Sequence, residues 1–343
     1  RMKEEKNDDG DDDDDDDVQG QDTPDAPFDE DEEDDSREKM RARLQAERER
    51  EREKELGFRR RKKEKTKKKR DEDSEEEEED EDIVIKDKRE FVMLPAPQNR
   101  KKAVECFIER KKGGLFGSWT PVYHLYISDT CEHLLSSKKS AGHSRSSYYA
   151  INFEKKGIDE TKGHSYLGKL RANFVGTEFH IFDDGRNPKD VSSQSNDLRR
   201  ELGLVTYATN VMGSNGPRKL KILIPRVDPE TNKPRVFRPY RKSEGLAARI
   251  ERDSTADCVC LVNKKPRWSD SVGAYVLNFN GRVTMASVKN FQLVEKGSDE
   301  ETVILQFGRI GKNKFSMDYR WPMSAYQAFA ICLSAFDGKL ACE

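Results

Sequence analysis

Residues 323–336 read MSAYQAFAICLSAF, and the expected fold is built around them. Apolar side chains fall on every face of a helix built from it, and only Ser324, Gln327 and Ser334 interrupt them. A surface helix has one apolar stripe, so a helix that is apolar all round is expected to be buried on every side. At about fourteen residues it is too short to cross a bilayer, which takes roughly twenty. Pro322 stands where a first-turn proline is tolerated, and Gly338 where a helix ends.

Upstream of this helix the sequence is rich in short β-prone runs separated by turn residues. One helix is expected among them, at 244–252. Thirteen candidate strands, one of which we expect to be a false positive, are 104–109, 122–128, 133–137, 147–153, 169–175, 177–183, 204–210, 218–224, 257–262, 275–279, 287–294, 302–308 and 313–319. The pattern predicts a mainly β fold, a closed twelve-stranded β-barrel filled by its C-terminal hydrophobic α-helix, because closure removes exposed edges.

Charge divides the chain into two predicted parts. Residues 1–90 hold 24 Lys and Arg against 40 Asp and Glu, a net charge of −16, whereas residues 91–343 hold 40 against 27, a net charge of +13. A segment that is mostly charged cannot bury enough apolar surface to offset chain entropy, so 1–90 is expected to be disordered. Order is expected to begin near Phe91, where FVMLPAPQ indicates an extended start to the folded domain at 91–343.

The charged part contains an acidic tract at 1–35, a helix-prone stretch at 36–56 and then a basic block. The members of the block are Arg59, Arg60, Arg61, Lys62, Lys63, Lys67, Lys68, Lys69 and Arg70. Such a block is typical of a nuclear import signal or a nucleic-acid contact. The plainer interpretation is a solvated linker neutralised by the acidic run at 71–82, and the sequence alone does not separate the two.

No catalytic motif stands out, so we expect neither an enzyme nor a cofactor. The six cysteines lack the spacing of a disulfide framework, which predicts reduced thiols in a cytosolic or nuclear protein. No signal peptide and no transmembrane run is expected. His124, Cys131 and His133 can meet across a hairpin, but we expect no metal there.

Two cations on one predicted strand are the best candidates for a binding site. Lys169 and Arg171 are two positions apart, so both point to one face while Leu170 points inward. Such a strand can present two cations to one multiply charged anion, since arginine binds phosphate through two parallel hydrogen bonds and lysine adds a compact charge. Two exposed cations are also the ordinary solvated face of a strand. Further positive charge comes from Arg199, Arg200, Arg218, Lys219 and Lys221.

Two long stretches resemble the signatures of the tubby family. They are FNGRVTMASVKNFQ at 279–292 and AFAICLSAFDGKLACE at 328–343. Three further stretches are similar to the family as well: KLRANFVGT at 169–177, TNVMGSNGPRKL at 209–220 and QFGRIGKNKFSMDY at 306–319. The resemblance covers about 91–343 and none of the acidic segment. Asn280 departs from the usual Lys, His or Gln, and Ala335 from the usual Ser.

The resemblance implies a twelve-stranded closed barrel around a central hydrophobic helix, in agreement with the pattern above. It also implies binding of phosphatidylinositol 4,5-bisphosphate without catalysis. The family's phosphate-binding Lys-x-Arg pair falls on Lys169 and Arg171, and its further arginine, in an LRxEL motif, falls on Arg199. A family asparagine on the preceding strand aligns with Tyr148, so that contact is either lost or made by the tyrosine hydroxyl.

These inferences predict a monomeric adaptor at the cytoplasmic face of the plasma membrane. The resemblance implies receptor cargo and the intraflagellar transport complex A as partners, the cytoplasm and cilium as locations, and release to the nucleus when phospholipase C removes the lipid. The rival hypothesis is a DNA-binding transcription regulator with an acidic activation segment, since nucleic acids are rich in phosphate too. The two differ in geometry, because a head group needs one tight cluster of cations and DNA a long stripe.

Overall fold

The computed structural model describes residues 82–111, 120–141, 147–155, 163–208, 219–252, 254–270, 274–298 and 302–337. All of them belong to one compact unit that spans Glu79–Glu343. The acidic tract, the helix expected at 36–56 and the basic block from Arg59 to Arg70 lie outside the described residues, so the division near residue 90 stays a prediction. None of the helices in the described ranges has the length and apolar character needed to span a bilayer.

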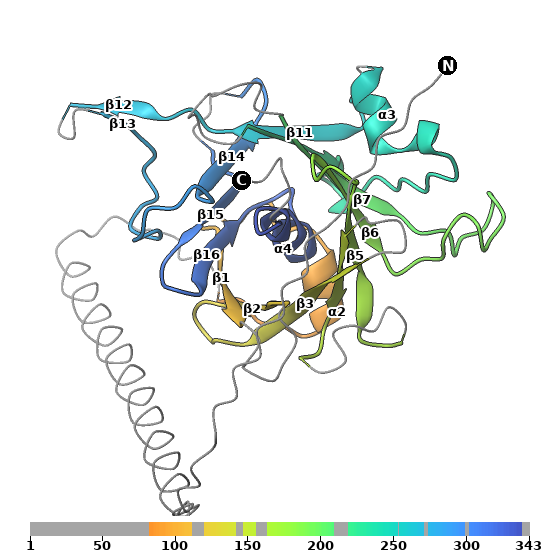
Figure 1. Cartoon of the computed structure of the whole chain (residues 1–343), viewed down its shortest axis with the longest axis horizontal. Coiled ribbons are helices and arrows are strands. Elements are labelled where there is room, and N and C mark those ends of the chain that lie inside the picture. The colour runs from red at the N-terminus through yellow and green to blue at the C-terminus, as the bar shows by residue number, and fades with distance from the viewer. Residues whose placement is uncertain are drawn as a thin grey trace, which may run out of the picture. The chain divides into compact units, whose positions relative to one another are not determined.

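Twelve strands form one closed barrel, in which each strand pairs antiparallel with both neighbours (Figure 1). Around the barrel the order is β1-β16-β15-β14-β11-β8-β7-β6-β5-β4-β3-β2. The strands are β1 (Val104–Lys111), β2 (Val122–Ile127), β3 (His133–Ala141), β4 (Ser147–Asn152), β5 (Tyr166–Ala172), β6 (Glu178–Asp183), β7 (Glu201–Tyr207), β8 (Leu220–Pro225), β11 (Cys258–Asn263), β14 (Phe291–Glu295), β15 (Leu305–Arg309) and β16 (Lys314–Tyr319). The predicted fold class is confirmed.

Twelve of the thirteen predicted strands are the barrel strands, and 275–279 is the false positive. Its residues overlap β13 (Ala274–Val276), which pairs only with β12 (Arg267–Ser269) in a hairpin that extends away from the barrel (Figure 1). A second small pair joins β9 (Val227–Asp228) to β10 (Lys233–Pro234). The helix expected at 244–252 is present as the turn η1 (Lys242–Glu244) followed by α3 (Leu246–Glu251).

The extended start expected at Phe91 is wrong, because helix α2 (Lys88–Met93) runs through it. Asp87 caps this helix by accepting a hydrogen bond from the backbone N–H of Glu90, at 2.9 Å. Val92 is buried in the core, and the chain beyond it is joined by a backbone hydrogen bond from Ala96 N to the O of Met323, which precedes the central helix. Phe91 and Met93 are partly buried against the same core, so a short helix and not an extended segment brings FVM to the barrel.

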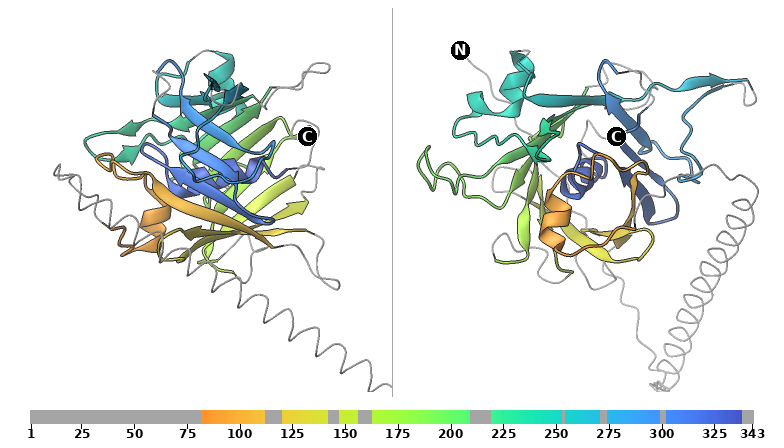
Figure 2. Two further views of the ribbon diagram at one scale, coloured as in Figure 1. Left: turned by 90° about the vertical axis from the view of Figure 1, so that its left-hand side faces the viewer. Right: turned by 180° about the vertical axis from the view of Figure 1, so that it is seen from behind.

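Helix α4 (Ala325–Ser334) runs through the middle of the barrel, and all ten of its residues are buried (Figure 2). Its polar side chains have partners on the barrel wall. The hydroxyl of Tyr326 donates to Phe182 O at 2.7 Å, Gln327 Nε2 donates to Leu202 O at 2.8 Å, and Ser334 Oγ lies 2.8 Å from the Tyr207 hydroxyl. The prediction of a central helix buried on every side is confirmed.

The polar residues that interrupt the apolar stretch define where the helix begins. Ser324 is the N-cap, and its hydroxyl accepts from the backbone of Gln327 while the Gln327 side chain accepts from the backbone of Ser324. This capping box satisfies N–H groups that would otherwise be buried without partners. The expectation of a first-turn proline is therefore wrong, since Pro322 lies two residues before the N-cap.

A buried carboxylate closes the other end of α4. Asp337 is fully buried and accepts hydrogen bonds from Lys139 Nζ at 3.0 Å, from Ser147 Oγ at 3.1 Å and from the Tyr149 hydroxyl at 3.2 Å. These donors come from β3 and β4, so the helix end is fixed to that part of the wall. A buried charge is tolerated when it is paired and hydrogen-bonded, as here.

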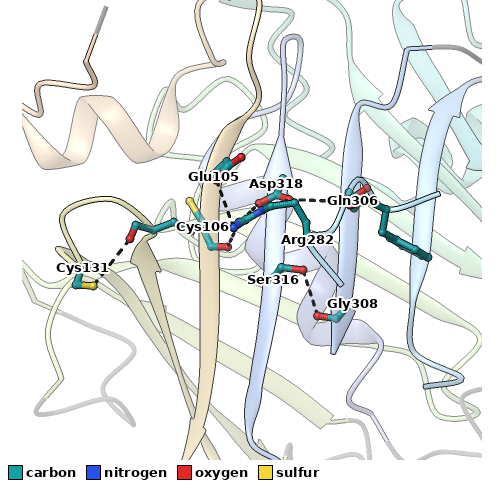
Figure 3. A network of polar contacts seen from close by, with 10 residues as sticks. Glu105, Cys106, Cys131, Arg282, Gln306, Gly308, Ser316 and Asp318 are labelled. Carbon is teal, nitrogen blue, oxygen red and sulfur yellow. Dashed lines mark hydrogen bonds and ion pairs between the residues drawn. The ribbon is translucent and has the colours of Figure 1, made fainter. Parts of the chain in front are cut away.

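A strap at 277–290, between β13 and β14, lies along the outside of the barrel. The guanidinium of Arg282 donates to both carboxylate oxygens of Asp318 on β16, at 2.5 and 3.0 Å, and pairs with Glu105 on β1 at 3.3 Å (Figure 3). Val283 covers Gly308, where an added Cβ would lie 2.3 Å from Val283 Cγ2. One of the two family-like stretches therefore serves to clamp β1, β15 and β16 together.

The central helix gives a direct test of the fold. Replacing Phe329, which is fully buried in α4, by Ala is expected to lower the free energy of unfolding by about 3–5 kcal/mol, because the wall cannot collapse onto the cavity. Urea denaturation measures it. Val288→Ala, at a side chain that is 78% exposed on the strap, is the control and is expected to change stability by less than about 0.5 kcal/mol. Equal stability of the two variants would place α4 outside the core.

Candidate functional site

Three predicted site residues come together on the outer face of β5–β7. In β5, Leu170 is buried in the core, whereas Lys169 is half-buried and Arg171 is exposed on the other face. Arg199 lies just before β7. Burial lowers the pKa of Lys169, and the positive charges of Arg199 and Arg171 lower it further. The pKa of Arg199 is likewise lowered by burial and by Arg171, so the three cations lie within electrostatic reach of one another.

The Arg199 side chain is held against an aromatic ring. Its guanidinium carbon lies 4.1 Å from the ring centroid of Phe182, which is directly opposite Lys169 in the β5–β6 register. This is a cation–π contact that fixes the plane of the guanidinium. Arg199 Nε is buried and has no hydrogen-bond partner among the described residues. The site thus contains a donor that is positioned but not used within the protein.

The backbone around Arg199 is fixed by a close approach of two segments. Arg199 N donates to Arg186 O at 3.0 Å, and Arg186 forms an isolated parallel bridge with Leu198. Gly185 makes this approach possible, because a Cβ added there would lie 2.4 Å from the Cα of Arg199. A side chain at 185 would therefore displace the arginine from the wall.

Two carboxylates, Glu201 and Asp183, lie close enough to raise the pKa of Arg199 against the effect of burial, but neither forms an ion pair with it. In the described ranges, no acidic side chain forms an ion pair with Lys169, Arg171 or Arg199. The carboxylate of Asp183 is already occupied, since it accepts from Arg200 Nε at 2.6 Å and from Arg200 N at 2.7 Å. Arg200, which the sequence places among the cations that enrich the domain in positive charge, therefore belongs to an internal ion pair.

The remaining candidates are placed around this cluster. Tyr148 on β4 pairs directly with Arg171 on β5 and is half-buried, while its neighbour Tyr149 points into the core. It therefore borders the site on the same outer wall. Lys221 lies on β8, two strands beyond β6, and Lys219 just precedes that strand, whereas Arg218 lies outside the described residues. The cluster consists of Lys169, Arg171 and Arg199, with Tyr148 at its border.

Sequence reasoning missed two residues of this wall, Phe182 and His180. Their rings stack, with centroids 5.8 Å apart and planes 5° from parallel. Along β6, His180 and Phe182 alternate with core residues, so both rings stand on the outer face beside the cations. The signal in the sequence is Phe182, an aromatic residue at a position where the alternation of β6 calls for an outward, polar side chain. This strand pairs with the strand that carries Lys169 and Arg171.

His180 is held between two carboxylates. Its ring nitrogens lie 2.6 Å from Glu178 Oε1 and 2.6 Å from Glu201 Oε1. Burial lowers the pKa of His180, but the hydrogen bonds and charges of the two glutamates outweigh it and raise the pKa to about 9. Glu201 also accepts from the backbone N–H of Leu246 at the start of α3, at 2.8 Å. The network joins β6, β7 and α3 behind the cation cluster.

The histidine pair at the β2–β3 hairpin does not form a metal site with Cys131. His124 Nδ1 and His133 Nε2 each lie 2.7 Å from Ser136 Oγ, so the two rings do meet across the hairpin. Cys131 instead donates weakly to Ser128 O, at 3.9 Å. Burial lowers the pKa of His124 to about 4 and that of His133 to about 3. No group of three metal-ligating side chains is found in the part of the chain that the structure describes.

The His180 network makes stability depend on pH. Because the pKa of His180 is raised from 6.5 to about 9 on folding, its charged form stabilises the protein fully below about pH 6.5, and this contribution is lost as the pH rises through about 9. We expect the Tm of the wild type, measured by calorimetry, to fall as the pH rises across this interval. In His180→Gln the Tm is expected to depend less steeply on pH. His164→Gln, at an exposed position outside the network, is the control. An unchanged slope in His180→Gln would contradict the assignment.

Comparison with known proteins identifies the family of the barrel domain. The model of the Tub family matches residues 94–338. Tubby-related protein 1 of Homo sapiens is 41% identical over 262 residues, which cover 76% of this chain and 47% of the relative. Tubby-related protein 2 of Mus musculus is 42% identical over 260 residues, covering 75% of this chain and 45% of the relative.

A more distant organism gives a similar match. Tubby protein homolog 1 of Caenorhabditis elegans is 40% identical over 249 residues, which cover 70% of this chain and 58% of the relative. The chain spans about half the length of the human and mouse relatives that it matches. Since the family model covers nearly all of the barrel and the identities stand near 40%, the chain belongs to the Tub family, which is a family of proteins that are not enzymes.

Proposed function

We propose that this protein binds phosphatidylinositol 4,5-bisphosphate in the cytoplasmic leaflet of a membrane and acts there as an adaptor. The observation that carries the proposal is the cluster of Lys169, Arg171 and Arg199 on the outer face of β5–β7, in which the charges of the two arginines lower the pKa of Lys169 after burial does. Like charges held this close are relieved by an anion that carries more than one negative charge. Membership of the tubby family supports the same ligand.

The compactness of the cluster favours a lipid head group over DNA. Lys169 and Arg171 are two residues apart on β5, which places their Cα atoms about 7 Å apart. The phosphates at ring positions 4 and 5 are neighbours, so one head group can contact all three cations. A DNA site needs cations along a stripe of successive phosphates. Each basic residue near an anionic membrane contributes about 1 kcal/mol, so a few contacts suffice for reversible binding.

The wider role is proposed from the family resemblance. The barrel would hold receptor cargo at the plasma membrane and deliver it to the cilium with the intraflagellar transport complex A. Hydrolysis of the lipid by phospholipase C would release it, and the basic block from Arg59 to Arg70 would then act as a nuclear import signal. Tyr148 would border the head group in place of an asparagine. We propose that the protein acts as a monomer.

The proposal is tested by sedimentation with vesicles. Vesicles of phosphatidylcholine carry either phosphatidylinositol 4,5-bisphosphate or phosphatidylserine at equal total charge. The wild type is expected to prefer the former, and Lys169→Ala/Arg171→Ala to lose at least about tenfold in affinity and the preference with it. Lys219→Ala/Lys221→Ala removes the same charge from the β8 side and is expected to keep the preference. Both pairs are on the outer wall, so the melting temperature should stay unchanged.

Two results would overturn the assignment. If the Lys169/Arg171 variant folds normally and still selects the lipid, the binding site lies elsewhere. If both double variants lose affinity equally, binding follows net charge and not a site. Duplex DNA as a competitor tests the rival hypothesis, because displacement from the vesicles by DNA would favour a shared phosphate surface.

In cells, activation of phospholipase C is expected to release the wild type from the plasma membrane.

A further inference from the structure

The turn between β5 and β6 exposes two large apolar side chains next to the cation cluster. Phe174 is 64% exposed and Val175 is 47% exposed, although most of the barrel's aromatic rings are buried or half-buried. Single exposed apolar residues are normal on a protein surface. Here two consecutive ones occupy the tip of a hairpin, starting three residues after Arg171. Their position calls for a specific explanation.

The tip has a fixed conformation. Asn173 Oδ1 accepts from the backbone N–H groups of Gly176 at 2.7 Å and Thr177 at 3.0 Å, and Asn173 Nδ2 donates to Thr177 Oγ1 at 2.9 Å. The backbone hydrogen bond from Asn173 N to Glu178 O, at 2.8 Å, closes the hairpin below the tip. Gly176 adopts a φ of 80°, in the left-handed region that suits glycine. Phe174 and Val175 are therefore presented outward by a pre-organised turn.

The tip and the cluster lie along one strand. Lys169, Arg171 and Phe174 follow one another along β5 and into the turn, and a rise of about 3.3 Å per residue puts Phe174 at most about 10 Å from Arg171, because β5 ends at Ala172. An apolar tip next to a cluster of cations matches the order of groups in an anionic membrane, where phosphates lie outside the hydrocarbon. Aromatic side chains favour that boundary, and apolar burial adds to electrostatic attraction there.

We propose that the β5–β6 hairpin inserts Phe174 and Val175 into the hydrocarbon edge of the bilayer while Lys169, Arg171 and Arg199 hold the head group. The inference rests on the proposed function and adds a second contact to it. The partner that this apolar tip contacts is a bilayer that contains phosphoinositide, because the cations beside the tip are complementary to phosphate. Two other strongly exposed apolar side chains, Val288 on the strap and Trp268 on the β12–β13 hairpin, lie on elements that do not pair with β5 or β6, so they provide matched controls.

The test compares a bilayer with the free head group. Phe174→Ser is expected to weaken binding to phosphatidylcholine vesicles that contain phosphatidylinositol 4,5-bisphosphate by about tenfold, since the burial of one aromatic side chain is lost. Its affinity for soluble inositol 1,4,5-trisphosphate, measured by calorimetry, should equal that of the wild type. Val288→Ser is expected to change neither affinity. Phe174 is exposed, so the melting temperature of the variant reports that folding is intact.

The depth to which the β5–β6 tip enters the bilayer is measured independently by the tryptophan fluorescence of Phe174→Trp. The wild type already holds three tryptophans, so the quenching of Phe174→Trp by lipids brominated on the acyl chain is expected to exceed that of the wild type. The head-group variant Lys169→Ala/Arg171→Ala should reduce this extra quenching in the same background. Equal vesicle affinity of Phe174→Ser and wild type, or a bound Phe174→Trp protein that is quenched no more than the wild type, would overturn insertion and leave head-group binding standing.

Two further outcomes separate the inference from the proposed function. Loss of affinity for the soluble head group in Phe174→Ser would mean that Phe174 shapes the head-group site and does not insert. A wild type that binds neither the soluble head group nor the vesicles would overturn the proposed function and insertion with it. Binding of Phe174 in a groove of a protein partner would show as vesicle affinity that is independent of Phe174.

Discussion

The structure depends on the burial of α4 inside a closed wall. A barrel of twelve strands encloses more space than its own inward side chains can fill, and interiors tolerate few voids, so something must occupy the centre. A helix is the one segment that satisfies its own backbone hydrogen bonds without pairing to the wall. Its side-chain polar groups are satisfied by the wall through Tyr326, Gln327 and Ser334, and its C-terminal end through Asp337. The apolar residues that face α4 make up the main core, while Leu204, Leu223 and Cys258 on β7, β8 and β11 form a second, smaller cluster with Leu246 of α3.

Because the inner face of the strands fills the core, the outer face of β5 and β16 can carry charged side chains. On β5 the alternation sends Leu170 to the helix and leaves Lys169 and Arg171 outside, on a backbone that is paired on both sides. A cation pair on such a strand keeps its spacing when a ligand arrives, which lowers the cost of binding. The same rule applies on β16, where Asp318 faces outward and the strap covers it with Arg282. The same alternation therefore exposes the carboxylate of the Arg282–Asp318 clamp on β16 and the cations of the cluster on β5.

The sequence predicts the parts of the fold that follow from periodicity. The barrel strands, the central helix and the outward direction of Lys169 and Arg171 follow from alternation and apolar content. Other features depend on contacts between segments far apart in the chain. The start of α4 is set by the Ser324–Gln327 capping box, whose residues look like interruptions in the sequence. The contact of the Arg199 guanidinium with the Phe182 ring joins two segments far apart in the chain, and the pairing of Arg200 with Asp183 removes one cation from the surface. Neither can be seen before the strands are paired.

The two proposed membrane contacts would respond differently to conditions. The attraction of Lys169, Arg171 and Arg199 to phosphates is screened over about 8–10 Å at ordinary salt and ends when the phosphates are removed. The apolar contact of Phe174 and Val175 with hydrocarbon is insensitive to salt and to the identity of the head group. Either contact alone is weak, since one apolar tip gives only marginal binding and a few cations give reversible binding. A protein that needs both would therefore leave the membrane when the lipid loses its phosphates, although the tip could still enter the bilayer. The three cations would select the lipid. The apolar tip would lengthen the time that the protein stays bound, because insertion slows dissociation without discriminating between lipids.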